Sequence, residues 1–297
     1  HLDIGITNIC NLECTFCART ILVNEDKFRE PAHMDFELFK KIIDEATEIG
    51  TFSVNLNLLN EPLTNPELVK MIKYAKMKGI VDVHFHSHGG LLTEKKSLEL
   101  INSGLDKLLV SIDSPKKESY EKLRVLSKFD SVISNLKRFK EIRDSHQSLQ
   151  PLIKCLFIEF PGITQEEIQE NLEFGLKLAD CVGFQEYIDP TNTIGEKKEY
   201  ERDYQSSFAC QQPFTRLSIA EDGTVSPCCL DHEFDLSVGN VKTKSITDLW
   251  KSKEMEIIRD KQKNGKFFEI PRCRNCQMAT DADEGIPTQF ETYGPTI

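Results

Sequence analysis

The segment Leu105-Asp-Lys-Leu-Leu-Val-Ser-Ile-Asp113 decides the fold class. Its centre, Leu-Leu-Val-Ser-Ile, is almost continuously apolar, as is typical of a strand buried on both faces of a parallel sheet. A helix-like stretch precedes it and ends at Gly104, and another follows from Ser114. The segment therefore predicts a buried parallel strand between two connecting helices, which is the repeating unit of an α/β fold.

Five further strands are expected before residue 200, separated by helix-like segments. The helices carry apolar side chains at three- and four-residue spacing, and several begin at a capping residue and end at glycine. This alternation predicts an α/β fold whose parallel sheet curls into a partial (β/α)6 TIM-like barrel. The expected strands are residues 2–7, 53–59, 81–85, 105–113, 152–160 and 181–187, and the expected helices are residues 35–50, 65–79, 93–104, 114–124, 127–144 and 164–179.

The alternation stops near residue 200, and we place a domain boundary there. Residues 1–200 are the expected barrel, and residues 201–297 are a smaller α+β domain. In the second part, Arg216–Ala220 and Thr224–Pro227 flank Glu-Asp-Gly, a turn sequence that predicts a β-hairpin. One amphipathic helix is expected over Ser245–Lys263.

The chain of 297 residues carries a net charge of -11 at pH 7. Non-specific nucleic-acid binding requires Lys and Arg to neutralise phosphates, so this negative net charge predicts that nucleic acid is not a partner. No apolar run is long enough to span a membrane, so no membrane partner is expected. The sequence begins at His1 rather than Met, which leaves open what preceded it, including a signal peptide or a small N-terminal domain.

Ten cysteines are present, and seven of them fall into tight groups. Such clustering does not suit a disulfide framework. Close Cys-x-x-Cys spacing indicates metal or redox use, and it predicts a reducing, cytoplasmic compartment. The groups are Cys10, Cys14 and Cys17; Cys228 and Cys229; and Cys273 and Cys276.

The first group lies in Cys10-Asn-Leu-Glu-Cys14-Thr-Phe-Cys17, directly after the first expected strand. A structural zinc ion takes four protein ligands, so three thiolates leave it one short. An iron–sulfur cube can be held by three thiolates, with one iron left open for a small molecule. The spacing favours a reactive cluster and leaves a zinc knuckle or unrelated thiols as alternatives.

The pattern Cys-x3-Cys-x2-Cys, with Phe16 before its third cysteine, resembles the signature of radical S-adenosylmethionine (SAM) enzymes. The resemblance covers residues 2 to about 190. It implies that Cys10, Cys14 and Cys17 hold a [4Fe-4S] cluster whose open iron binds SAM. It also implies that cleavage of SAM yields a 5′-deoxyadenosyl radical, which abstracts hydrogen from a substrate.

Three further segments resemble SAM-binding motifs of this family. Leu59-Asn60-Glu61-Pro62 keeps the Glu-Pro of a Gly-Gly-Glu-Pro-like loop, and His86-Ser87-His88-Gly89 stands where relatives often have Thr-Asn-Gly. Val110-Ser111-Ile112-Asp113 resembles the fourth-strand motif, and Arg124 is either a partner for the SAM carboxylate or a helix-surface arginine. The resemblance thus implies a SAM pocket made by Phe16, Asn60, Glu61, Pro62, Ser87, His88, Ser111, Asp113 and Arg124.

The C-terminal cysteines resemble the SPASM and twitch extensions of many radical SAM enzymes, with Gly223 placed five residues before Cys228. A full SPASM extension has more cysteines and holds two clusters, whereas this layout is similar to that of the butirosin-pathway dehydrogenase and implies one auxiliary [4Fe-4S] cluster for electron transfer. Zinc on the same thiolates is the alternative metal, and Cys229 is the alternative to Cys228. The implied ligands are Cys210, Cys228, Cys273 and Cys276.

Polar residues at the carboxyl ends of the fifth and sixth strands are candidate catalytic groups, because strand ends face the mouth of a barrel. By alternation, Gln185 and Tyr187 share one face of the sixth strand and Glu186 lies on the other. Which face points inward stays open. The candidates for a general base or a substrate contact are Glu159, Glu186 and Tyr187.

The resemblance implies a radical SAM oxidoreductase, and we expect dehydrogenation of a small polyol or aminosugar-like substrate. Two other reactions stay open, namely modification of a peptide or protein side chain, as in RiPP-type maturases, and redox-neutral epimerisation. A metal-binding or redox-sensing protein without catalysis is a third alternative. An enzyme of this class also implies an electron donor such as flavodoxin or ferredoxin as a partner. Substrate identity, the general base and the oligomeric state stay open.

Overall fold

The computed structural model describes residues 1–192, 209–274, 276–278 and 291–293. The boundary predicted at residue 200 lies outside these residues. The division into a barrel of residues 1–200 and a second domain of residues 201–297 therefore stays a prediction.

Ten strands form one sheet within the described residues: β1 (Leu2–Ile4), β2 (Ser53–Asn55), β3 (Asp82–Ser87), β4 (Lys107–Ser111), β5 (Leu152–Glu159), β6 (Cys181–Glu186), β7 (Leu217–Ile219), β8 (Thr224–Ser226), β9 (Gly239–Asn240) and β10 (Glu291–Tyr293). Their spatial order is β10-β6-β5-β4-β3-β2-β1-β7-β8-β9. From β1 to β6, each strand pairs in parallel with the next. The predicted α/β class with six parallel strands is confirmed.

The helices are α1 (Ala18–Asn24), α2 (Phe36–Glu48), α3 (Leu68–Met77), α4 (Glu94–Ile101), α5 (Lys117–Leu123), α6 (Phe129–Ser145), α7 (Gln165–Leu176), α8 (Gln212–Thr215), α9 (Ile246–Trp250), α10 (Lys253–Lys263) and α11 (Pro271–Arg274). Short 3-10 helices cover Pro62–Thr64, Pro190–Asn192 and Phe267–Glu269. Side-chain caps fix several starts. The Asp35 carboxylate accepts backbone N–H groups at the start of α2, and the Thr93 and Thr164 hydroxyls do so for α4 and α7.

Two helical segments depart from the sequence prediction. The single helix expected over Ser245–Lys263 is wrong, because the chain forms α9 and α10 with Ser252 between them. Ser252 adopts an extended backbone (ψ 156°), and its hydroxyl accepts the Met255 N–H, so it starts a new helix. Helix α1 was not predicted; it is short and follows Cys17, whose side chain makes no capping hydrogen bond.

The two faces of the parallel sheet differ. Helix α7 packs closely on one face, where a Cβ added at Gly175 would lie 2.6 Å from Val182 and 3.0 Å from Phe157. On the opposite face, a Cβ added at Gly183 would collide with the Lys154 side chain. We call these the helix face and the inner face.

Strand β3 shows how the two faces are filled. Val83 and Phe85 are fully buried on the helix face, which contributes to the apolar core. His84 and His86 are half-buried on the inner face. Burial, together with the charge of His84, lowers the pKa of His86 to about 4. Strand β3 therefore presents polar side chains to the inner face and apolar side chains to the helix face.

The C-terminal part of the chain continues the barrel sheet. Strand β7 pairs in parallel with β1, and β8 and β9 follow in antiparallel order. The predicted hairpin is confirmed, with Gly223 at its turn in the left-handed region (φ +89°). Helix α9 docks on α2, where the Ile246 N–H donates to the Glu45 carboxylate (2.8 Å).

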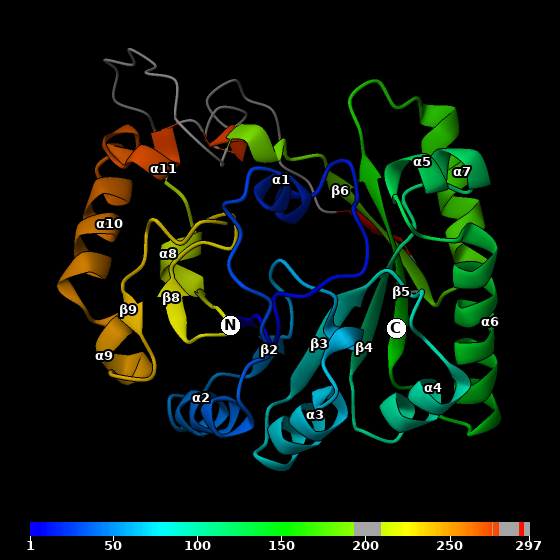
Figure 1. Ribbon diagram of the computed structural model, residues 1–297, viewed down its shortest axis with the longest axis horizontal. Helices are drawn as coiled ribbons and strands as arrows, with labels where there is room; N and C mark the ends of the chain where they lie inside the picture. The colour runs from blue at the N-terminus through cyan, green and yellow to red at the C-terminus, as the bar shows by residue number, and fades with distance from the viewer. Residues whose placement is uncertain (193–208, 275, 279–290, 294–297) are drawn as a thin grey trace.

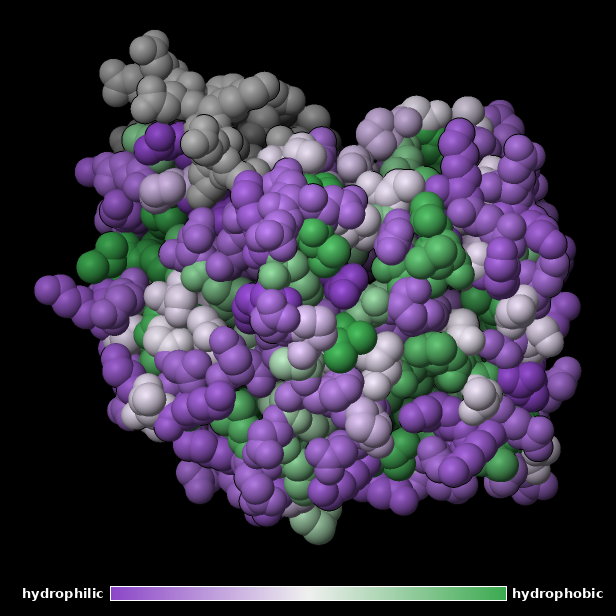
Figure 2. All heavy atoms as spheres, viewed as in Figure 1, coloured by the Kyte–Doolittle hydropathy of each residue, from purple (hydrophilic) through white to green (hydrophobic). Residues whose placement is uncertain are grey.

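Figure 1 shows α2 to α7 around the parallel strands and α8 to α11 gathered to the left of them. Figure 2 shows that polar side chains cover most of this face, with apolar residues scattered among them. Across the described ranges, no helix has the length and apolar character needed to cross a membrane.

Candidate active site

The loop that joins β1 to α1 carries the first cysteine group at the carboxyl end of the sheet. Backbone hydrogen bonds hold this loop from two sides. The Thr15 N–H donates to the Leu123 carbonyl at the end of α5 (2.9 Å), and the Glu61 N–H donates to the Ile9 carbonyl (2.9 Å). The loop is thus fixed against the connections that follow β2 and β4.

The structure brings Cys10, Cys14 and Cys17 within electrostatic reach of one another. Burial raises the pKa of Cys10 to about 11 and the pKa of Cys14 to about 12. Such thiols lose their protons when a metal compensates the thiolate charge. The Leu12 N–H already donates to the Cys10 sulfur (3.4 Å), as donors around cluster ligands do. These residues fit a cluster with three thiolate ligands.

The Glu61 carboxylate is buried and engaged by its own chain. It accepts hydrogen bonds from the Ser87 hydroxyl (2.9 Å), the Leu63 N–H (3.1 Å) and the His88 N–H (2.9 Å). Pro62 begins the 3-10 helix that follows. The carboxylate therefore joins the ends of β2 and β3, and a contact of this loop with the SAM ammonium group stays a prediction.

His88 connects the end of β3 to the cysteine loop. Its Nδ1 accepts the Gly90 N–H (2.9 Å), which assigns the proton to Nε2, and Nε2–H donates to the Asn11 side-chain oxygen (3.0 Å). Burial lowers the pKa of His88, so the neutral ring is favoured. Asn11, directly after Cys10, is a contact that the sequence analysis missed, although its place inside the cysteine motif was a signal.

Arg124 and Asp113 form a buried ion pair beside the cysteine loop. Arg124 Nε donates to the Asp113 carboxylate (2.7 Å), and Arg124 Nη1 lies 3.9 Å from the Cys14 sulfur. Arg124 is 7% exposed, so the helix-surface alternative for this residue is wrong. Burial raises the pKa of the Asp113 carboxyl, and the Arg124 charge opposes the shift. Asp113 has a left-handed backbone (φ 59°), a strained conformation that recurs at functional sites.

Three other predicted SAM contacts, Ser111, Asn60 and Phe16, lie in different surroundings. Ser111 ends β4 on the inner face and is half-buried. The Asn60 side chain instead folds back, where its oxygen accepts the Leu58 N–H (2.7 Å) and stabilises its own turn. The Phe16 ring lies under the Arg124 guanidinium at 5.4 Å from carbon to ring centre.

A row of aromatic rings leads from the cysteine loop to the end of β6. Phe16 contacts Phe160 edge-on with ring centres 5.3 Å apart, and Phe160 contacts Tyr187 at 5.2 Å. The Tyr187 carbonyl accepts the side-chain amide of Gln277 (3.1 Å), which follows Cys276. Tyr187 thus lies between the two cysteine regions.

Glu159 and Glu186 occupy matching positions at the ends of β5 and β6. Strand alternation puts them on the side of Phe157 and Phe184, whose rings stack 5.8 Å apart on the helix face. Ser111 and Gln185 belong to the inner face. The structure therefore does not bring these two carboxylates to the inner wall of the barrel.

The four cysteines of the predicted second set meet in one cavity between α8, α10 and α11. Cys210, Cys228 and the pair Cys273 and Cys276 come from separate parts of the chain, so the fold assembles the set. Apolar side chains form most of the remaining wall, and three polar residues, Gln212, Gln262 and Arg272, complete it. The polar part of the lining is therefore Cys210, Cys228, Cys273 and Cys276 together with Gln212, Gln262 and Arg272.

The adjacent cysteines 228 and 229 point to different places. Cys228 lines the cavity, and its sulfur accepts the Leu230 N–H (3.4 Å). Cys229 does not line the cavity; its sulfur lies 3.9 Å from Arg216 Nη1 and is influenced by the charge of Asp3 near the start of β1. The geometry distinguishes the two alternatives that the sequence left open, in favour of Cys228.

The cavity also bears on the choice between a cluster and a single ion. Among the residues that the structure describes, no three His, Cys, Asp or Glu side chains converge on a point that one metal ion would occupy. Tetrahedral zinc holds each thiolate at about 2.3 Å, whereas a cube spreads its four thiolates further apart. Within the same residues, Nη1 of the buried Arg272, which lines the cavity, has no hydrogen-bond partner, whereas Nε pairs with the Asp231 carboxylate (3.4 Å). The donor set fits an iron–sulfur cluster.

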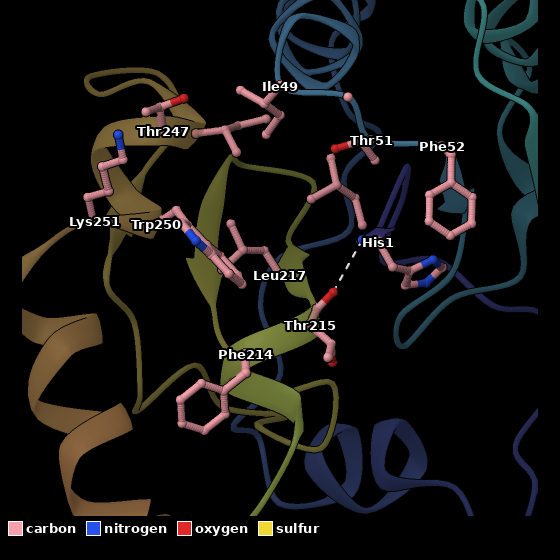
Figure 3. Close-up of a pocket in the computed structure, with 13 residues that line it drawn as sticks. His1, Ile49, Thr51, Phe52, Phe214, Thr215, Leu217, Thr247, Trp250 and Lys251 are labelled. Atoms are coloured by element: carbon pink, nitrogen blue, oxygen red, sulfur yellow. Dashed lines mark hydrogen bonds between the residues drawn. The ribbon is translucent and has the colours of Figure 1, made fainter. Parts of the chain in front are cut away.

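A larger hollow of about 480 Å³ lies at the other end of the strands (Figure 3). It is formed by the start of β1, the end of α2, β7 and α9. Ile49, Phe52 and Trp250 line it, and the His1 amino group donates to the Thr215 carbonyl (3.2 Å) at its edge. No cysteine lines it, so this hollow is separate from the two cysteine sites.

The chain belongs to the radical SAM superfamily, whose profile matches residues 4–175. A SPASM profile, described as an iron–sulfur cluster-binding domain, matches residues 210–277. The first match covers the three-cysteine loop and the second covers the four-cysteine cavity. The predicted family, fold class and cofactor types are confirmed: the chain uses SAM, a [4Fe-4S] cluster and auxiliary iron–sulfur binding.

Two curated relatives extend over most of the chain. One is the tungsten-containing aldehyde ferredoxin oxidoreductase cofactor-modifying protein of Pyrococcus furiosus, 22% identical over 337 aligned positions that cover 99% of this chain and 92% of that protein. The other is a probable GTP 3′,8-cyclase of Methanocaldococcus jannaschii, 25% identical over 259 positions that cover 77% of this chain and 84% of that protein.

Two solved structures share the fold. BtrN in complex with AdoMet and 2-DOIA superposes with a TM-score of 0.61 and 16% identity, covering 93% of this chain and 92% of that one. Streptococcus suis SuiB bound to precursor peptide SuiA gives a TM-score of 0.69 and 16% identity, covering 87% of this chain and 66% of that one. These likenesses establish a shared architecture of barrel and C-terminal extension.

Proposed function

We propose that this chain is a radical SAM oxidoreductase that dehydrogenates a small polyol or aminosugar-like substrate with the help of one auxiliary cluster. The supporting observation is the cavity lined by Cys210, Cys228, Cys273 and Cys276. Four thiolates saturate a single [4Fe-4S] cluster, which leaves no iron for substrate and suits the cluster to accept an electron. The proposal includes a cytoplasmic, reducing compartment and a flavodoxin- or ferredoxin-type donor.

The residues of the first site have separate tasks in this proposal. When bound, the cluster on Cys10, Cys14 and Cys17 and its SAM supply a radical that removes a hydrogen atom from a carbinol carbon. Arg124, held by Asp113, keeps a positive charge beside Cys14 and over Phe16, where a SAM carboxylate would be stabilised.

Oxidation of the carbinol also requires loss of a hydroxyl proton and of one further electron. A proton acceptor has to approach from the inner face or from the mouth of the barrel. Tyr187 directly follows β6 and lies beside Phe160, and we retain it as a substrate contact. Glu159 and Glu186 lie on the helix face, so the proposal assigns the proton to neither of them.

The curated relatives support a small substrate. Their names specify a cofactor and GTP, both of them small molecules, although the reactions named are modification and cyclisation rather than dehydrogenation. A peptide substrate is the second candidate, because SuiB bound to its precursor peptide shares the fold over 87% of this chain.

The test uses anaerobically reconstituted, reduced protein. The proposal expects about eight iron and about eight sulfide per chain, as two cubes require. With a polyol or aminosugar deuterated at the carbinol carbon, deuterium should appear in 5′-deoxyadenosine and one carbonyl should form per SAM cleaved. Turnover of peptides alone would favour the second candidate. Inverted product without net oxidation would indicate an epimerase, and absence of SAM cleavage would contradict catalysis altogether.

A further inference from the structure

Gln262 on α10 connects two cysteines of the auxiliary cavity. Its side-chain amide donates to the Cys273 sulfur (3.6 Å), and its side-chain oxygen accepts the Cys210 N–H (3.1 Å). Gln262 is 1% exposed and lines the cavity. Both the donor end and the acceptor end of this buried amide are thus bonded to residues of the proposed cluster site.

The remaining wall explains why such a donor matters. Pro213, Leu230, Ile258 and Phe267 line the same cavity. A reduced cluster carries one more negative charge than an oxidised one, and an apolar wall disfavours that charge. An N–H group aimed at a ligand sulfur offsets this cost in the reduced state, so it raises the reduction potential.

Other N–H donors at the cavity would also raise the reduction potential. They are held either by the backbone or by ion pairs, unlike the Gln262 side chain. The Leu230 N–H that reaches the Cys228 sulfur belongs to the backbone turn, as the Leu12 N–H does at the first site. Arg272 is also held by carboxylates, Asp231 and Glu233 among them, which offset its charge. Gln262 is neutral and can be replaced without disturbing an ion pair.

We propose that Gln262 is a positioning residue that raises the reduction potential of the auxiliary cluster, so that the cluster accepts the substrate's second electron. This inference rests on the proposed function for the direction of electron flow. It assigns no contact with substrate or SAM to Gln262.

The test compares reconstituted holoenzyme of wild type with Gln262→Met, which keeps side-chain volume and removes both hydrogen bonds. Gln169→Met, at an exposed position on α7, is the matched control. EPR-monitored redox titration should show the auxiliary cluster shifted to a more negative midpoint in Gln262→Met alone, with the SAM-binding cluster unmoved. An unshifted auxiliary midpoint at full iron content would overturn the proposal.

A second measurement covers the case in which Gln262→Met fails to retain the cluster. Wild-type protein is labelled with ¹⁵N in glutamine side-chain amides, and the reduced auxiliary cluster is examined by pulsed EPR. A nitrogen coupling that changes from ¹⁴N to ¹⁵N character and persists in Gln212→Met supports the N–H···S bond of Gln262, and no labelled coupling contradicts it. Because neither readout requires substrate, failure of the dehydrogenase proposal would appear separately, in the deuterium assay.

Discussion

The two cysteine regions differ in how the chain assembles them. The first set lies within residues 10–17 and is shaped by one loop, which hydrogen bonds to Ile9 and Leu123 hold in place. The second set comes from residues 210, 228, 273 and 276, and α8, α10 and α11 bring it together. Three thiolates in a loop leave one coordination position open, whereas four thiolates in an apolar cavity leave none.

The open coordination position of the first set and the complete thiolate ligation of the second set have separate structural causes. Beside the open set lie a buried ion pair and polar strand ends, where a charged cofactor finds partners. Around the closed set lie apolar side chains and a few N–H donors. The first environment suits chemistry on a bound molecule, and the second suits storage of one electron.

Loss of a ligand from the open set should have the largest effect. Cys14→Ala is expected to abolish SAM cleavage and to reduce iron from about eight to about four per chain, because only the second cluster remains. Thr15→Ala, at an exposed position in the same loop, should retain both SAM cleavage and the full iron content. The measurements are iron and sulfide content and 5′-deoxyadenosine formation. Full iron content in Cys14→Ala would contradict the assignment of Cys14 as a ligand of the first cluster.

The adjacent cysteines of the closed set provide the second test. Cys228→Ala should lose about four iron per chain and the oxidised product, while SAM cleavage persists, because the radical site is intact. Cys229→Ala should keep both clusters, since its sulfur faces Arg216 instead of the cavity. Iron content and the ratio of product to 5′-deoxyadenosine distinguish the two variants. Loss of the cluster in Cys229→Ala but not in Cys228→Ala would identify Cys229 as the ligand instead.

The Arg124–Asp113 pair gives a third, intermediate effect. Arg124→Met leaves the Asp113 carboxylate buried and unpaired, which costs about 3–5 kcal/mol of folding free energy. SAM cleavage should fall as well, because the charge beside Cys14 is lost. Denaturant unfolding and a SAM-binding titration measure the two effects. Lys122→Met, at an exposed position on α5, should change neither, and Arg124→Met with Asp113→Asn should recover part of the stability.

The first region was more predictable from sequence than the second. The three-cysteine spacing and the apolar run ending at Asp113 are local patterns, and both indicated features that the structure contains. The break at Ser252 was missed because the apolar spacing of α9 and α10 reads as one continuous helix, whereas a side-chain cap separates them. That prediction relied on the spacing of apolar residues and overlooked the capping role of Ser252.

Contacts between distant residues set the limit of sequence reasoning. Gln262 meets Cys210 and Cys273 only after α10 has packed beside α8, and nothing in the sequence around Gln262 indicates those partners. The inner and helix faces of β5 and β6 were likewise undecided until α7 was placed on one of them. Alternation determines which residues share a face, and tertiary packing determines which face is inside.

A contact between the two regions gives the smallest expected effect. Glu221, in the β7–β8 turn, accepts the side-chain N–H of Asn8 (2.9 Å) and pairs with Arg29 (3.1 Å), so the C-terminal part supports the loop before Cys10. Burial raises the pKa of Glu221, with Arg29 opposing. A carboxyl whose pKa is raised by folding contributes stability at low pH and loses it as pH rises through the folded value.

Wild type should therefore lose stability relative to Glu221→Gln as pH rises above the ordinary glutamate pKa of about 4.3. Gln cannot ionise, and its side-chain oxygen still accepts from Asn8, so Glu221→Gln should lack this pH-dependent contribution. Glu221→Ala removes the acceptor and should cost about 1–3 kcal/mol at every pH, because the buried Asn8 amide loses a partner. Thermal unfolding across pH measures both changes. Identical pH profiles for wild type and Glu221→Gln would contradict this expectation, because they would show that the Arg29 charge fully offsets the effect of burial on the Glu221 pKa.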